Sequence, residues 1–150
     1  MFVYADNAAT TKMSKAAINA MMPAFEEYYA NPSSLHSTGQ AAAEKLFNAR
    51  QSIAQNLNAE AREIYFTSGG SEADNQAILT AAILGKRKGK THIVSTAFEH
   101  HAVLHTLKKL EKEGFEITLL DVHENGILTA DEVQDAIREN TCLVTIMFAN

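Results

Sequence analysis

The sequence predicts an α/β protein in which an N-terminal helical arm is followed by the first part of a mainly parallel sheet, with helices on both faces. From residue 62 onward, β-rich runs alternate with helical segments, which is typical of parallel sheets with right-handed crossovers. The predicted strands are nearly continuous apolar runs, as expected where helices cover both faces. We therefore divide the chain into residues 1–58, the arm and its helices, and residues 59–150, the first βα units.

The arm contains two predicted helices. Residues 3–4 are expected to form a short strand. Ser14 can cap a helix that runs to about Tyr29, because apolar residues recur on one face of it. The Asn-Pro-Ser-Ser segment at 31–34 ends this helix, since the residue before a proline avoids the helical region. A second helix is predicted over about 39–57.

The second region alternates strands with helices. The expected elements, in order, are a strand at 64–67, a helix at 72–84, a strand at 91–94, a helix at 102–112, a strand at 115–120, a helix from 129 to about 139 and a strand at 142–148. Gly114 is expected to end the helix before it, and Thr129 with Glu132 to form a capping box. The last strand is followed by no helix before residue 150, so we expect the chain to be part of a larger protein.

Composition excludes several classes of protein. The 13 Lys and Arg against 18 Asp and Glu give a net charge of −5, which argues against a nucleic-acid partner. Cys142 is the single cysteine, so no disulfide framework can form and a reducing, cytoplasmic location is expected. The apolar runs are far too short for a membrane span, and the N-terminus does not look like a signal peptide.

A glycine-containing loop carries the strongest local signal for chemistry. It is the segment 67–75, Thr-Ser-Gly-Gly-Ser-Glu-Ala-Asp-Asn, between a predicted strand and a predicted helix. The free amides of a helix's first turn bind anions, and the backbone of Gly70 with the hydroxyl of Ser71 would suit a phosphate. The pattern is neither a Walker A loop nor a dinucleotide fingerprint. An ordinary helix cap remains the alternative at this point.

Histidines follow the next predicted strand. His100 is expected to project over the crevice that the glycine loop faces, where an imidazole can stack on a ring or move protons near neutral pH. A surface or capping histidine is the alternative. His101 and His105 have the i, i+4 spacing of a metal pair, but the glutamate of the H-E-x-x-H motif is missing, and we expect no metal. Cys142 is expected to be a small buried hydrophobe.

Four segments together resemble one family. They are Asp6–Thr11 (DNAATT), Asn31–His36 (NPSSLH), Phe66–Asn75 (FTSGGSEADN) and Glu99–Leu104 (EHHAVL). In this order they look like the NifS/IscS-type cysteine desulfurases, which are pyridoxal 5'-phosphate (PLP) enzymes of aminotransferase class V with the fold-type I architecture. The resemblance covers all 150 residues and implies an incomplete fold-type I large domain.

The resemblance also implies a function. The full-length enzyme would take sulfur from L-cysteine, release L-alanine and hold the sulfur as a persulfide for iron–sulfur cluster or thionucleoside biosynthesis. By matching position, Gly70 and Ser71 would bind the PLP phosphate, and His100 would stack on the pyridine ring and act in proton transfer. The family usually has Thr where this chain has Ser71, and both carry the hydroxyl. A sulfur-acceptor or scaffold protein and a homodimeric partner are implied as well.

Other parts of the family's site have no match in this chain. The resemblance places the Schiff-base lysine and the persulfide cysteine after residue 150, and it does not assign a cofactor contact to Asn150. We therefore expect residues 1–150 alone to be inactive. Two alternatives remain: another class V PLP enzyme, such as an aminotransferase or a lyase, and a non-catalytic module that binds a phosphate or a partner.

Overall fold

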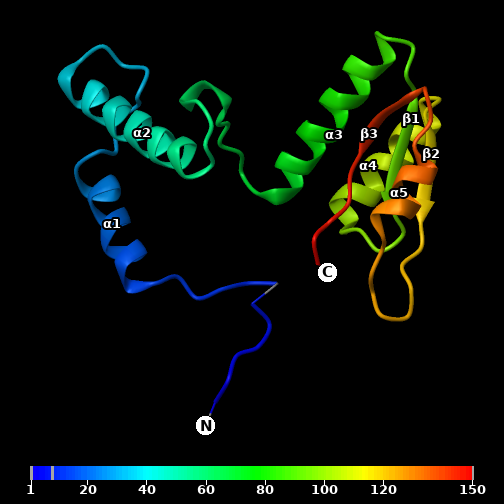
Figure 1. The fold of residues 1–150 in the computed structure, drawn as a ribbon. Coiled ribbons are helices and arrows are strands. Elements are labelled where there is room, and N and C mark those ends of the chain that lie inside the picture. The colour runs from blue at the N-terminus through cyan, green and yellow to red at the C-terminus, as the bar shows by residue number, and fades with distance from the viewer. Residues whose placement is uncertain (1, 8, 150) are drawn as a thin grey trace. The chain divides into compact units, whose positions relative to one another are not determined.

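The computed structural model describes residues 2–7 and 9–149, and the chain forms two compact units, residues 1–66 and 67–150 (Figure 1). The first unit is helical and the second is an α/β unit. Each is described by itself below. The prediction of an α/β chain that begins with helices is confirmed.

Three helices make up the regular structure described in the first unit. They are α1 (Lys15–Glu26), α2 (Ser37–Asn56) and the short 3₁₀ helix η1 (Ala61–Glu63). Ser14 caps α1 as predicted, because its side chain accepts a hydrogen bond from the amide of Ala17 at 3.1 Å. The strand predicted at residues 3–4 is wrong, since a strand needs a paired neighbour and none of the described residues pairs with this segment.

The start of α2 is fixed by a histidine and a tight turn. His36 Nδ1 accepts the amide of Gly39 at 3.2 Å, so the helix begins two residues earlier than the pattern predicted. Asn31 makes the preceding turn, with its side chain accepting the Ser33 amide at 2.9 Å and its carbonyl accepting the Ser34 amide at 3.0 Å. A Cβ on Gly39 would lie 2.7 Å from the carbonyl oxygen of Ser34, so this close approach requires glycine.

The strand predicted at residues 64–67 is also wrong. Ile64 has extended backbone angles, with φ −96° and ψ 122°, but no described strand lies beside it to form a ladder. Its carbonyl is bonded instead by the guanidinium of Arg50 in α2. A β-forming composition favours extended backbone, whereas pairing depends on a partner that the local sequence does not reveal.

The second unit contains a three-stranded sheet with helices before and between its strands. Its elements are α3 (Gly70–Lys86), β1 (His92–Thr96), α4 (His101–Lys112), β2 (Glu116–Leu120), α5 (Ala130–Ala136) and β3 (Thr141–Val144). The strand order is β2-β1-β3, and both pairings are parallel as predicted.

Helix boundaries in this unit follow local chemistry. Gly114, with φ +93°, follows the end of α4 as predicted. The capping box of Thr129 and Glu132 opens α5, but this helix ends at Ala136 because Ile137 is extended. The last strand stops at Val144, four residues earlier than predicted.

The order of strands reverses at β1. The chain passes from β1 through α4 to β2 on one side, and then through α5 to β3 on the other side. Right-handed crossovers in opposite directions put α4 and α5 on opposite faces of the sheet, as the ribbon shows (Figure 1). Ligands of open parallel sheets bind at such a reversal, outside the carboxyl ends of the strands.

A packed core holds α3 and α4 on one face of the sheet. The buried cluster consists of Ile78, Ala82, Ile93, Val103, Leu107, Leu110 and Phe115. On β1, the fully buried His92 bridges both neighbouring strands, with Nε2 2.8 Å from the Thr118 hydroxyl and Nδ1 2.7 Å from the Thr141 hydroxyl. The core and this bridge together fix the register of the three strands.

Candidate functional site

The first turn of α3 presents amides that have no partner within the described part of the chain. No described acceptor bonds the amides of Gly70, Ser71 and Glu72, and the helix's own bonding starts with the Ala73 amide on the Gly69 carbonyl at 3.1 Å. Such amides, together with the helix dipole, attract an anion. The geometry is therefore that of an anion site at the residues the sequence singled out.

Hydrogen bonds within the loop before α3 fix its conformation. The Glu72 carboxylate accepts the Ser68 amide at 2.7 Å and the Ser68 hydroxyl at 2.6 Å. These hydrogen bonds from Ser68 lower the pKa of Glu72. Thr67 adds a hydrogen bond from its hydroxyl to the Gly69 carbonyl at 3.1 Å. The loop is thus preorganised, which reduces the entropy lost when a ligand binds.

Glycine at positions 69 and 70 is not required by this chain. The backbone of Gly69 is extended, with φ 165° and ψ 177°, a conformation open to any residue. A Cβ built on either glycine would meet no atom within 4 Å. Neither strain nor packing among the described residues explains them, and the open space leaves the backbone accessible to a ligand.

His100 follows β1 and caps α4. Its Nδ1 accepts the amide of Ala102 at 3.1 Å. A neutral imidazole that accepts at Nδ1 carries its proton on Nε2. The capping alternative considered for this histidine therefore holds in the structure, and it fixes the ring's tautomer and orientation at the same time.

Ser71 and His100 line one hollow. It has a volume of about 500 Å³ and lies where the N-terminal turns of α3 and α4 meet. Its lining residues are Ser71, Asn75, His100, His101, Ala102, His105, Thr106 and Lys109. None of these described lining residues carries a carboxylate, whereas three imidazoles and one ammonium group do line it. The hollow is therefore suited to an anionic ligand.

The residue that directly precedes His100 in the chain, Glu99, carries a buried carboxylate. Glu99 is 5% exposed and accepts the amide of Met147 at 2.6 Å and the Thr96 hydroxyl at 3.4 Å. It thereby links the segment after β1 to the segment after β3, next to the strand-order reversal. The sequence gives no sign of this burial, because a glutamate that follows a strand is usually exposed.

His101, His105 and Cys142 were the other candidates for chemistry in the second unit. The rings of His101 and His105 stack with centroids 5.6 Å apart, and no group of three or more metal-ligating side chains occurs among residues 2–7 and 9–149. Cys142 is half-buried, donates to the His92 carbonyl at 3.4 Å, and has its pKa raised by burial. A thiol with a raised pKa carries little thiolate near neutral pH and is poorly suited to act as a nucleophile.

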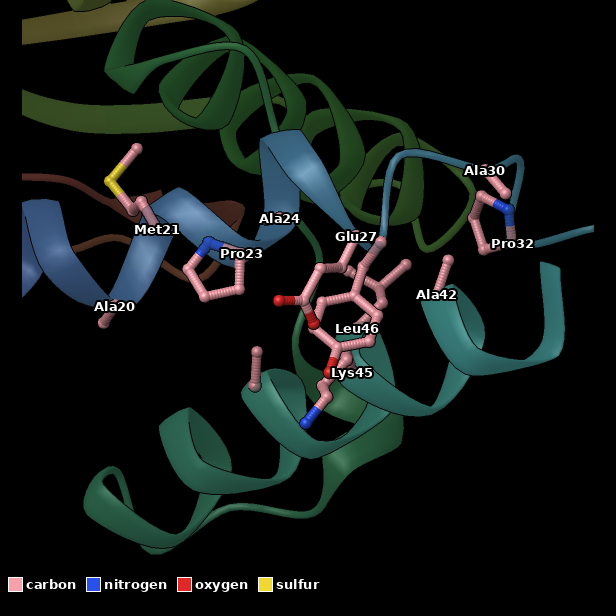
Figure 2. A pocket seen from close by; sticks show the side chains of 12 residues that line it. Ala20, Met21, Pro23, Ala24, Glu27, Ala30, Pro32, Ala42, Lys45 and Leu46 are labelled. Carbon is pink, nitrogen blue, oxygen red and sulfur yellow. The ribbon is translucent and has the colours of Figure 1, made fainter. Parts of the chain in front are cut away.

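A larger hollow, of about 650 Å³, lies in the first unit. Figure 2 shows its lining side chains, which come from α1, α2 and the segment between them. Most are apolar, and the ammonium of Lys45 lies 4.9 Å from the ring centroid of Tyr28. The smaller hollow at Ser71 and His100 is the better candidate for an anionic ligand, because its lining carries imidazole, ammonium and hydroxyl groups and no carboxylate.

Two motifs of the resemblance lie in the first unit. In the first motif the Thr10 amide donates to the Asp6 carbonyl at 3.3 Å, and Ala8 lies outside the described residues. The segment 31–36 makes the turn and cap before α2. Asn150 also lies outside the described residues. The lining residues described for the hollow at Ser71 and His100 belong to the second unit.

Comparison with known proteins identifies the family. Residues 3–150 match aminotransferase class V, and the chain belongs to that family. It is 48% identical over 148 residues to the cysteine desulfurase IscS of Methanosarcina thermophila, a match that covers 99% of this chain and 36% of that protein. The resemblance carried by the four motifs is thereby confirmed.

Solved structures agree with the sequence relatives. A NifS-like protein is 36% identical with a TM-score of 0.92, over 100% of this chain and 41% of its own. A structure of SspA in complex with cysteine is 38% identical with a TM-score of 0.83, over 93% of this chain and 40% of its own. The chain spans about two fifths of the length of these proteins.

A membrane-spanning segment would need a long, apolar helix, and none of the helices in the described residues meets that requirement.

Proposed function

We propose that this chain forms the phosphate-binding and ring-facing part of the PLP site of a cysteine desulfurase. The observation that carries the proposal is that Ser71 and His100, from two different helix N-termini, line one hollow without carboxylates. Membership of aminotransferase class V and the similarity to IscS proteins support it. In this proposal residues 59–150 are the first part of the cofactor-binding domain.

The residues present fit PLP. Its phosphate needs several donors, which the unbonded amides of Gly70 and Ser71 and the Ser71 hydroxyl provide. The absence of side chains at positions 69 and 70 leaves room for close approach to the backbone. When bound, PLP supplies an electron sink for negative charge on the carbon next to an amino group.

His100 would lie against the ring and handle a proton. Its Nδ1 is used by the Ala102 amide, so the exchangeable proton of the neutral ring is on Nε2. That atom can donate a proton and take it back without breaking the cap. Glu99 keeps the preceding backbone in place through Met147, which holds the imidazole in position.

L-Cysteine is the proposed substrate, and an enzyme thiol is the proposed sulfur acceptor. The carbon–sulfur bond of cysteine breaks, a sulfur–sulfur bond forms on the thiol, and a proton goes to the carbon, giving alanine and a persulfide. A related structure, SspA, is in complex with cysteine. Cys142 is unsuited as acceptor, since its thiol is packed and its pKa is raised. We propose that the acceptor thiol and the lysine that binds PLP belong to other parts of the protein.

The remaining assignments follow the family. We propose a cytoplasmic homodimer that passes its sulfur to an acceptor or scaffold protein for iron–sulfur cluster or thionucleoside biosynthesis. The single cysteine of this chain supports a reducing compartment.

The test is product analysis with the full-length protein. With PLP, L-cysteine and a thiol reductant, we expect alanine and sulfide in equal amounts. His100→Gln should lower the rate about 100-fold, the size typical of losing a general acid–base group. His123→Gln is the matched control, because His123 bonds Glu132 in a turn and does not line the hollow. Bound PLP with transamination and no alanine from cysteine would instead identify another class V enzyme.

A further inference from the structure

Two polar side chains that line the hollow, Asn75 of α3 and Thr106 of α4, are also hydrogen-bonded to each other. Thr106 is 4% exposed, and its hydroxyl lies 2.5 Å from Asn75 Oδ1 and 2.8 Å from the Ala102 carbonyl. The amide nitrogen of Asn75 donates to the Ser71 carbonyl at 2.6 Å. The hydroxyl has one proton, so its two acceptors share it.

These bonds connect the two ends of the proposed PLP site. The path runs from the Ser71 carbonyl through the Asn75 side chain and the Thr106 hydroxyl to Ala102, whose amide bonds His100 Nδ1. The Thr106 hydroxyl proton is shared between the Asn75 and Ala102 acceptors, and both the oxygen and the nitrogen of the Asn75 side-chain amide are used. The first turn of α3 is thus tied to the first turn of α4 at the edge of the hollow.

Apolar side chains would hold these helices together equally well. Ile78, Val103 and Leu107 already pack at the same interface. A polar pair costs free energy to desolvate and recovers it only through well-placed partners. What the pair adds over an apolar contact is directional constraint, because a hydrogen bond fixes distance and angle where van der Waals contact tolerates sliding.

We propose that Asn75 and Thr106 are positioning residues that set the placement of Ser71 relative to His100, and hence of the cofactor's phosphate relative to its ring. This inference rests on the proposed function. It predicts that cutting the link weakens recognition of the phosphate specifically, because Ser71 moves while the rest of the hollow stays.

The experiment compares cofactor affinity in variants of the full-length protein. Thr106→Val keeps the shape and removes the hydroxyl, and Thr106→Ser restores it. The apo-protein is titrated with PLP and with pyridoxal, which lacks the phosphate, and the ³¹P resonance of bound PLP is recorded. We expect Thr106→Val to weaken PLP about tenfold, the equivalent of about one hydrogen bond. Pyridoxal affinity should change less, and the ³¹P resonance should shift.

Three variants separate positioning from general stability. Thr106→Ser should bind PLP within about twofold of wild type, since the hydroxyl is retained. Asn75→Ala should match Thr106→Val, and the double variant should be no weaker, because both cut one link. Thr118→Val removes a hydroxyl bonded to His92 elsewhere in the same unit, so it should lower stability and leave PLP affinity unchanged.

The outcomes distinguish the two proposals. If wild type binds PLP and Ser71→Ala weakens it, but Thr106→Val and Asn75→Ala keep the wild-type PLP affinity and ³¹P resonance, the positioning link is refuted and the proposed function stands. Equal weakening by Thr106→Ser and Thr106→Val also refutes the link. If wild-type protein does not bind PLP, both proposals fail. A Thr106→Val protein that does not fold leaves Asn75→Ala and Thr106→Ser to decide.

Discussion

Residues 67–150 bury large side chains between helices and a sheet, whereas residues 1–66 keep theirs exposed. Ile93, Leu107 and Leu110 in the second unit are 0–2% exposed. In the first unit α1 has no buried residue, and the buried hydrophobic residues described there are Ala42 and Ala54. Phe25 is 67% exposed. Among the described residues, the second unit therefore has a core of large buried side chains, and the first unit has none.

Comparing the two units shows how much of the structure an amphipathic pattern predicts. Both units show apolar residues at helical spacing, and both form helices. Each unit even has a histidine that caps a helix, His36 on Gly39 and His100 on Ala102. The difference lies in what meets the apolar face, which the pattern alone does not specify. The four predictions below test this contrast.

The largest effect on stability is expected from truncating a core side chain of the second unit. Ile93→Ala should cost about 2–5 kcal/mol of unfolding free energy, because it leaves a cavity among packed side chains. Ile18→Ala in α1, where the side chain is 42% exposed, should cost about 0.5 kcal/mol or less. Urea unfolding of residues 1–150 measures both. Similar losses of unfolding free energy in Ile93→Ala and Ile18→Ala would contradict the difference in packing between the two units.

Glycine substitutions should separate close packing from ligand approach. A Cβ on Gly85 would lie 2.3 Å from Cys142 Cβ, so Gly85→Ala should cost about 1–3 kcal/mol. Gly70→Ala meets nothing within 4 Å and should change stability by about 1 kcal/mol or less, with stabilisation favoured by helix propensity. Unfolding curves of the apo-protein give both values. A loss at Gly70 as large as at Gly85 would show that position 70 is packed.

Removing the buried carboxylate of Glu99 should have a moderate effect. Glu99→Ala leaves the Met147 amide without its partner, which should cost about 1–3 kcal/mol. Glu99→Gln keeps an acceptor oxygen and should cost less. Amide hydrogen exchange at Met147 gives a local measurement, with faster exchange expected in Glu99→Ala. Slow exchange in that variant would mean that the carboxylate does not hold the segment after β3.

The smallest effect is expected at α5, the helix of the second unit that, like α1, has no buried residue. The hydroxyl and the amide of Thr129, with the hydroxyl the larger influence, lower the pKa of Glu132 from 4.5 to about 2. A lowered carboxyl pKa stabilises the fold above pH 4.5, and this contribution is lost as the pH falls toward 2. An NMR titration should show the low pKa and its rise toward 4.5 in Thr129→Ala. An unchanged pKa in that variant would contradict the capping box.

Local chemistry allowed much of the fold to be predicted. Ser14, Gly114 and the Thr129 capping box each act within a few residues, so the sequence identifies them directly. The topology rule for parallel sheets also placed His100 and the glycine loop near one crevice, and the structure puts Ser71 and His100 on one hollow. Whether they bind PLP stays a prediction.

The features that the sequence did not predict depend on contacts between residues distant in sequence. Ile64 has extended backbone angles, but the segment at 64–67 has no described neighbour to pair with, so its β-forming composition did not make it a strand. The bond between Asn75 and Thr106 joins residues 31 positions apart, and neither residue type announces it. The type and position of Glu99 in the sequence suggest a surface residue, whereas in the structure its carboxylate accepts the Met147 amide after β3. Such contacts depend on how helices and strands pack, which local propensity does not encode.

The central claim is that the first-turn amides of α3 and the ring of His100 bind opposite ends of PLP. A crystal structure of the full-length protein with PLP tests it most directly. We predict phosphate oxygens about 3 Å from the amide nitrogens of Gly70 and Ser71, with the imidazole of His100 against the pyridine ring. A phosphate bound elsewhere, or an imidazole turned away from the ring, would contradict the account.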